Sequence, residues 1–149
     1  MFTACVTHSD MRKTGEFRCS NEKVNQLQSN ISWSLRDNFF DIPSDCPQRD
    51  ERLGWMGDAQ VFSWTAAFNR ETALFFTKWM RDISAASSLE RGVPHIVPDI
   101  QGTYSSAAWS DAAVIIPWVV YQTYGDTRIL RRIMEMYARV GRLYSQSCK

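Results

Sequence analysis

The chain lacks an excess of charge of either sign. Its 149 residues contain 17 lysines and arginines against 16 aspartates and glutamates, which gives a formal net charge of +1. A balanced chain has no bulk electrostatic field that would attract nucleic acid or an anionic membrane surface. We therefore expect neither nucleic acid nor a membrane as a partner.

Histidine is scarce, and cysteine does not occur at metal-ligand spacing. The two histidines are His8 and His95, and the cysteines are Cys5, Cys19, Cys46 and Cys148. No CxxC pair is present and no histidine lies close to a cysteine in the sequence, so we expect no metal site and no cofactor. A chain of this size does not need a disulfide framework, although four cysteines leave a secreted context open.

Long apolar runs are also missing. No run approaches the length that crosses a membrane, and the N-terminus MFTACVTHSDMRK lacks the apolar core of a signal peptide. The location of the protein is therefore undecided at this point. With 44% hydrophobic and 13% aromatic residues, the chain still has enough apolar material for one globular domain with a substantial core.

Helical periodicity dominates after residue 19. Residues 1–19 carry two short β-like pieces, FTACV and GEFRC, which suggest a connecting strand or the tail of an upstream region. Ser20 and Asn21 are good N-caps for a first helix that ends near Asp37. Its apolar stripe is Val24, Leu27, Ile31 and Leu35.

Four more helices follow from the same signals. Asp58 is expected to cap a second helix, with Val61, Phe62, Trp64 and Phe68, and Asn69 to cap a third, with Leu74, Phe75, Phe76, Trp79, Met80 and Ile83. Ser110 and Asp111 open a fourth, almost wholly apolar helix that Gly125 ends. Asp126 caps a fifth, whose stripe is Ile129, Ile133, Met136, Tyr137, Val140 and Tyr144. The sequence therefore predicts an all-α chain that reads as part of a longer helical array.

The connections alternate between long and short. In an up-and-down array, alternating connections fall at alternating ends, so the two long loops, 38–57 and 87–109, should lie at the same end. Long loops on a rigid scaffold are where binding and catalytic residues concentrate. We expect a site to be built from these two loops.

The first long loop contains the dense segment DCPQRDERLGWMGD. Its carboxylates are Asp45, Asp50, Glu51 and Asp58, and its guanidinium groups are Arg49 and Arg52, so 2 positive minus 4 negative charges leave −2. Glycoside hydrolysis needs a carboxylic acid, a second carboxylate and polar groups that hold hydroxyls, and Trp55 offers a flat face to a sugar ring. From charge alone, a surface network of ion pairs or a capped helix entry is the more ordinary interpretation of the same residues. Trp55 could equally be core, and Cys46 a small buried filler.

A family resemblance gives this segment a more specific meaning. DCPQRDERLGWMGDAQ, from Asp45 to Gln60, closely resembles the signature of the bacterial and fungal α-L-rhamnosidases of glycoside hydrolase family 78. The flanks agree as well: SDM followed by TGEFRCSNEKVNQL, and VPD followed by AAWSDAAVIIPWVVYQTYGD. The resemblance covers nearly the whole chain. It implies an (α/α)6 barrel, of which residues 20–149 would supply about five of twelve helices, with 1–19 as a linker from an upstream β-domain.

The resemblance also implies residue roles. Glu51 would be the general acid of an enzyme that removes terminal α-L-rhamnose with inversion, and its pKa should be raised so that it can carry a proton. Asp45, Arg49, Trp55 and Asp58 would line the sugar pocket. A further pocket residue, less securely matched, is Trp109 in the second loop. Asp50 has the weaker claim to act as acid and is expected to face solvent.

The general base has no counterpart in this sequence. In the family it is a glutamate on a loop far downstream, and Glu71, Glu90 and Glu135 sit in no matching motif. We therefore expect the chain alone to be inactive and to depend on the remainder of a catalytic domain as its partner, with exposed apolar helix surface that favours association. Two alternatives stay open: a related (α/α)6 glycosidase for another sugar, and a non-catalytic carbohydrate-binding or helical interaction module.

Overall fold

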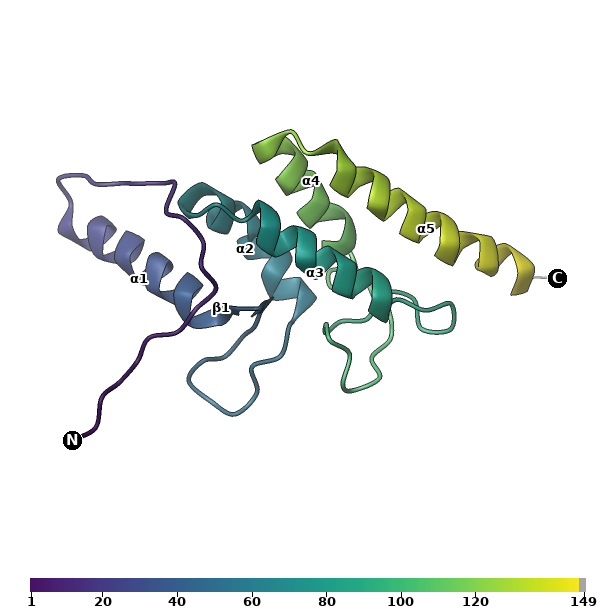
Figure 1. The fold of residues 1–149 in the computed structure, drawn as a ribbon, viewed down its shortest axis with the longest axis horizontal. Coiled ribbons are helices and arrows are strands. Elements are labelled where there is room, and N and C mark those ends of the chain that lie inside the picture. The colour runs from purple at the N-terminus through teal and green to yellow at the C-terminus, as the bar shows by residue number, and fades with distance from the viewer. Residues whose placement is uncertain (148–149) are drawn as a thin grey trace.

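The computed structural model describes residues 1–147, with side chains through residue 138 (Figure 1). Within that range it contains five helices and one two-stranded hairpin: α1 (Glu22–Asn38), β1 (Phe39–Phe40), β2 (Ile42–Pro43), α2 (Met56–Asn69), α3 (Ala73–Ala86), α4 (Ala112–Tyr124) and α5 (Thr127–Ser147). The predicted all-α organisation is confirmed. None of the helices in the described range is long and apolar enough to span a membrane.

The N-terminal segment runs across the connection between α2 and α3 before it reaches α1 (Figure 1). The β-like pieces expected within residues 1–19 form no strand among the described residues, and Lys13 makes a single antiparallel bridge with Arg70. The Glu71 N–H donates to the Arg12 carbonyl at 2.8 Å, and the Thr14 N–H to the Asn69 carbonyl at 3.0 Å. Backbone bonds therefore attach this segment to the helical body.

Three of the predicted helix boundaries are confirmed by their capping contacts. The Asn21 side chain accepts a hydrogen bond from the Lys23 N–H at 3.0 Å, as an N-cap should. Gly125 ends α4 in the left-handed conformation, with φ +69°, where the absence of a side chain avoids strain. The Asp126 carboxylate accepts from the Arg128 N–H at 2.9 Å and so caps α5.

Two predicted caps are wrong. Asp58 does not cap α2, because the helix begins at Met56 and Asp58 lies inside its first turn. Asn69 is the last residue of α2 rather than the cap of α3; its side chain donates to the Thr65 carbonyl at 2.7 Å and accepts from Gln28 at 2.5 Å. Asp111 occupies the cap position of α4 without a capping bond, and instead accepts from the Ala108 N–H at 2.9 Å. Of these bonds, the one from Gln28 to Asn69 is a tertiary contact, and the other two are local.

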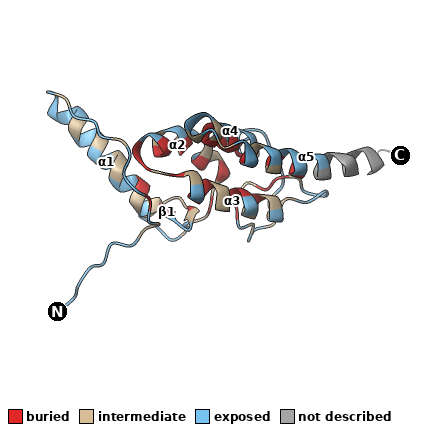
Figure 2. Ribbon diagram, turned by 45° about the horizontal axis from the view of Figure 1, so that its top comes forward, coloured by how far each residue is buried: buried red, intermediate tan, exposed pale blue. Residues whose placement is uncertain are grey.

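The core lies where α2, α3, α4 and α5 meet (Figure 2). The expected apolar face of α3 is confirmed, since Phe75, Phe76, Trp79, Met80 and Ile83 are buried, while Leu74 is exposed. Helix α5 buries Ile129, Ile133 and Met136. The side chains of Val140 and Tyr144 lie outside the described side chains, and Cys148 outside the described residues.

Helices α1 and α2 present their apolar residues differently from the predicted stripes. Of the α1 stripe, Leu35 is buried, whereas Val24 and Leu27 are exposed. Helix α2 buries small residues, among them Ala59, Ser63 and Ala66, while its large apolar residues Val61, Trp64 and Phe68 are exposed. Small side chains let α2 pack closely against its neighbours. Of its other large apolar residues, Met56 is buried and Phe62 packs partly buried against the core.

The two long loops lie at the same end of the helices, as predicted (Figure 1). Trp55 and Ile96 form an antiparallel bridge, in which the Met56 N–H donates to the His95 carbonyl and the Val97 N–H to the Gly54 carbonyl, both at 2.9 Å. A Cβ on Gly54 would lie 2.1 Å from the Val97 carbonyl oxygen, so this close approach requires glycine.

Candidate active site

A cavity of about 610 Å³ opens between the first long loop, the end of α1, the start of α2 and the end of the second loop. Three residues predicted from the sequence line it: Asp45, Asp58 and Trp109. Its apolar wall includes Phe39, Pro43, Ala59 and Phe62. A pocket with apolar walls and a few convergent polar groups suits a small polyhydroxylated ligand.

Asp45 is fixed at the neck of the first loop. The Asp45 N–H donates to the Leu53 carbonyl at 3.1 Å, and the Leu53 N–H donates to the Asp45 carboxylate at 3.0 Å. Between these two residues, Cys46 and Arg52 have positive φ angles of 44° and 54°. Non-glycine residues adopt this conformation infrequently, and the paired neck is what imposes it here.

Glu51 lies beside the cavity rather than in its lining, in contact with two further residues predicted for the site. Its carboxylate accepts from the Trp55 indole N–H at 2.8 Å and from Arg49 at 2.9 Å (Nε) and 2.6 Å (Nη2). Residues Glu51, Arg49 and Trp55 therefore form one hydrogen-bonded group. The side chain of Arg49 is largely exposed, and that of Glu51 is 23% exposed.

These contacts lower the pKa of Glu51 below its ordinary value, first through the Trp55 indole N–H and then through Arg49. The expectation of a raised pKa is wrong for this ligand-free arrangement. The sequence pattern shows the neighbouring carboxylates, but it does not show that the Trp55 indole and Arg49 both donate to Glu51. A general acid must carry a proton, so this contact has to change before Glu51 could donate one.

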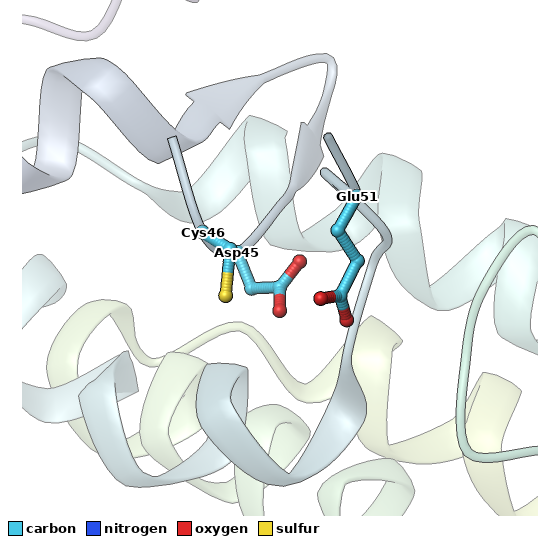
Figure 3. A group of neighbouring side chains, drawn as sticks. All are labelled: Asp45, Cys46 and Glu51. Atoms are coloured by element: carbon cyan, nitrogen blue, oxygen red, sulfur yellow. The ribbon is translucent and has the colours of Figure 1, made fainter. Parts of the chain in front are cut away.

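Asp45, Cys46 and Glu51 bring their side chains together at the mouth of the loop (Figure 3). One ligand atom from each lies within 4.8 Å of the other two. The pKa of the Cys46 thiol is raised, chiefly by its hydrogen bond with Asp45, which favours the neutral thiol over the thiolate that binds metals and acts as nucleophile. Cys46 is half-buried, so it is not the buried filler that the sequence suggested.

Trp109 covers the first turn of α2. A Cβ on Gly57 would lie 3.1 to 3.3 Å from atoms of the Trp109 indole, which shows how closely the ring rests on that glycine. The His95 ring lies 5.5 Å from the Trp109 ring, centroid to centroid. The Ser106 hydroxyl lies 2.6 Å from His95 Nε2. Trp109, at the end of the second long loop, therefore packs against the first turn of α2.

Sequence reasoning missed the residues that support Trp109, namely Gly57, His95 and Ser106. Gln60 belongs with them, because its side-chain amide donates to the carbonyl of Ala108, next to Trp109. Of these residues, His95 could have been identified from the sequence, because it is the only histidine in either long loop. By contrast, Asp50 is exposed, as predicted, and the guanidinium group of Arg52 donates to the Pro47 carbonyl at 2.8 Å within its own loop.

Comparison with known proteins assigns the chain to a family. The family model for the bacterial alpha-L-rhamnosidase 6 hairpin glycosidase domain matches residues 12–147. The chain belongs to this family. Its five helices within residues 1–147 correspond to a portion of the six-hairpin (α/α)6 barrel.

Individual relatives of the six-hairpin family cover most of the chain. An alpha-L-rhamnosidase of Formosa agariphila is 49% identical over 133 residues, covering 88% of this chain and 14% of that protein. An alpha-L-rhamnosidase of Streptomyces avermitilis is 42% identical over 129 residues, covering 86% of this chain and 12% of that protein. The chain therefore spans 12 to 14% of the length of these two curated relatives.

A solved six-hairpin structure superimposes closely. The crystal structure of Streptomyces avermitilis alpha-L-rhamnosidase complexed with L-rhamnose matches with a TM-score of 0.86 and 38% identity, covering 93% of this chain and 14% of that one. The structure of alpha-L-rhamnosidase from Dictyoglumus thermophilum gives a TM-score of 0.85 and 37% identity, with coverage of 93% and 16%.

Proposed function

We propose that this chain forms the acid-bearing part of an α-L-rhamnosidase catalytic domain, which hydrolyses terminal α-L-rhamnose from rhamnosides with inversion. The observation that carries the proposal is the cavity lined by Asp45, Asp58 and Trp109, with Glu51 at its edge. The family membership and the rhamnose complex of a relative support the choice of sugar.

The lining residues suit the two sides of a sugar ring. Trp109 offers an apolar indole face to ring C–H groups, and the carboxylates of Asp45 and Asp58 can accept hydrogen bonds from hydroxyls. Asp58 is exposed in the first turn of α2, where the positive end of the helix dipole stabilises its charge. These groups bind and orient the sugar.

Glu51 is the proposed general acid, and Arg49 and Trp55 set its protonation. In the ligand-free structure both donors favour the carboxylate form. The Arg49 side chain is 59% exposed, so its guanidinium group has room to turn from Glu51 to a sugar hydroxyl when the cavity fills. Loss of that ion pair raises the pKa of Glu51 and allows it to protonate the leaving oxygen.

Inversion requires a second carboxylate that activates water on the opposite face of the sugar, about 6.5 to 9.5 Å from the acid. We propose that this base is supplied by polypeptide outside these 149 residues. The chain alone should then bind the sugar and fail to cleave it.

The test is Glu51→Gln in a full-length rhamnosidase that carries this segment. Removal of a general acid should lower kcat on natural rhamnosides by about 10²- to 10⁴-fold, while the affinity for rhamnose stays within about twofold. Asp50→Asn is the matched control, because Asp50 is the exposed neighbour. Near-normal turnover by the Glu51 variant would contradict the assignment.

A carbohydrate-binding role without cleavage is the second candidate, and the ionised, ion-paired state of Glu51 favours it. The two functions separate in one pair of measurements on the full-length protein. Titration with rhamnose detects binding, and an aryl rhamnoside assay detects turnover. Binding with no turnover selects the second candidate.

A further inference from the structure

Arg70, at the far end of α2 from the candidate active site, is a buried cation. It follows the last residue of α2 and is 9% exposed. Its guanidinium group donates to the Met11 carbonyl at 3.1 Å, and within the described residues no carboxylate pairs with it. Burial of a charge costs free energy unless a partner compensates it.

Arg36 brings a second guanidinium group to the same place. It projects from the last turn of α1, with its guanidinium carbon 5.0 Å from the centroid of the Trp33 ring. Its Nε is buried and has no hydrogen-bond partner in the described part of the chain. The pKa of Arg70 is lowered, first by burial and then by the positive charge of Arg36, which agrees with two like charges held close together.

Both arginines line a cleft of about 280 Å³ between the N-terminal segment, α1 and the start of the α2–α3 connection. The other charged groups in its lining are Lys13 and Glu16, so 3 positive minus 1 negative charge leaves +2. Glu16 does not neutralise the arginines, because its side chain is 85% exposed and pairs with Lys13 at 3.4 Å. Ser29 and Ser32 add hydroxyl groups to the lining.

We propose that Arg36 and Arg70 form a binding site for an oxyanion of the carboxylate or phosphate class. Planar guanidinium groups match such anions with paired N–H donors, and the unpartnered Arg36 Nε supplies one of them. The site involves none of the residues that line the candidate sugar cavity, and it does not depend on the proposed glycosidase function.

Two sources of this anion share the same chemistry. One is a small anion in solution. The other is an acidic side chain of a longer polypeptide, since the relatives are far longer than this chain. Both place an oxyanion between the same two guanidinium groups.

The test is calorimetric titration of the 149-residue chain with inorganic phosphate at constant ionic strength, with circular dichroism to establish that each variant is equally helical. We expect saturable binding of phosphate, weakened at least about tenfold in the Arg36→Gln variant. The Arg36→Lys variant should weaken binding less, because it keeps the charge and loses only the paired N–H donors. Arg128→Gln is the control, because Arg128 is 86% exposed and pairs with Asp126. Absence of saturable binding, or equal binding by the Arg36→Gln variant, would overturn the proposal.

A second variant avoids disturbing the arginines. Ser29→Glu places a carboxylate in the cleft lining, so it should raise the midpoint of thermal unfolding and remove the response to phosphate. An unchanged phosphate response in this variant counts against the site.

The same titration on a full-length protein that carries the segment identifies the source of the anion. Phosphate binding that persists there indicates an anion from solution. Binding lost there but present in the 149-residue chain indicates that an acidic side chain of the polypeptide occupies the site. Either result supports the site, provided that the Arg36→Gln variant of the shorter chain has lost binding.

Discussion

Glu51 illustrates how a side chain's neighbours, rather than its own type, set its chemistry. The Trp55 indole and Arg49 both donate to its carboxyl group, and these bonds lower its pKa. The motif shows the three residues within one loop, yet Arg49 and Trp55 have no fixed helical spacing to Glu51 there. The hydrogen bonds that join them form in the folded loop, and the motif does not show those bonds. The sequence showed Arg49, Glu51 and Trp55 in one loop, but it did not show the direction in which the pKa of Glu51 is shifted.

Trp55→Phe removes the first of the two donors and should raise the pKa of Glu51 toward its ordinary value. A depressed carboxyl pKa stabilises the fold above the pKa of the unfolded chain, and that contribution disappears as the pH falls through the folded value. The variant should therefore lose stability at neutral pH and match the parent at low pH.

Carboxyl ¹³C chemical shifts followed over a pH titration measure the pKa of Glu51 directly. Trp64→Phe, on the exposed side of α2, is the matched control and should leave that pKa unchanged. A Glu51 pKa that is the same in the parent and in the Trp55 variant would show that the indole donor has no effect.

At the scale of helices and loops, the sequence predicted the elements well and their starting points less well. Asn21, Gly125 and Asp126 act locally, so their sequence context was sufficient. The start of α2 depends instead on Met56, whose N–H donates to His95 in the other long loop. A contact between segments about forty residues apart leaves no periodic signal around Asp58, which is why the expected cap there was wrong.

The start of α5 offers a test of a cap whose strength depends on pH. Asp126 accepts from the Arg128 N–H and guanidinium group, and these bonds lower its pKa from 3.8 to about 2. Asp126→Ala should cost about 1 kcal/mol in free energy of unfolding at neutral pH. Because the folded pKa is depressed, this contribution is present above about pH 4 and disappears as the pH falls toward 2.

Urea unfolding at several pH values gives the required free energies. Asp126→Asn is the control, since asparagine also caps well but does not titrate, and its stability relative to Asp126→Ala should not vary with pH. If the gap between the parent and Asp126→Ala is as wide at pH 2 as at pH 7, the pKa of Asp126 is not depressed by the cap.

At the scale of the whole molecule, hydrophobic patterning predicted which segments are helices but not which residues the described chain buries. Val24 and Leu27 on α1 follow the helical period as faithfully as Leu35, and only Leu35 is buried. Periodicity identifies an apolar face, but it does not indicate whether another element covers that face. The alternating loop lengths carried more information, because they placed the two long loops at one end.

The apolar side chains that remain exposed on α2 and α4 lead to the last prediction. These two helices pack against each other, and they leave exposed the set Val61, Trp64, Phe68, Val114 and Trp118. Burial of apolar surface gains roughly 25 cal/mol per Å², so molecules that expose such side chains gain free energy by associating. We expect the 149-residue chain to sediment as a concentration-dependent mixture of monomer and larger species.

The double variant Trp64→Ser with Trp118→Ser should shift that mixture toward monomer in sedimentation velocity runs at matched concentrations. Leu74→Ser is the control: Leu74 is 84% exposed but lies on α3, outside the set, so its loss should leave association unchanged. Equal association of the parent and the double variant would place the contact elsewhere on the molecule. A selective loss would instead identify α2 and α4 as the surface that another hairpin of a six-hairpin domain would cover.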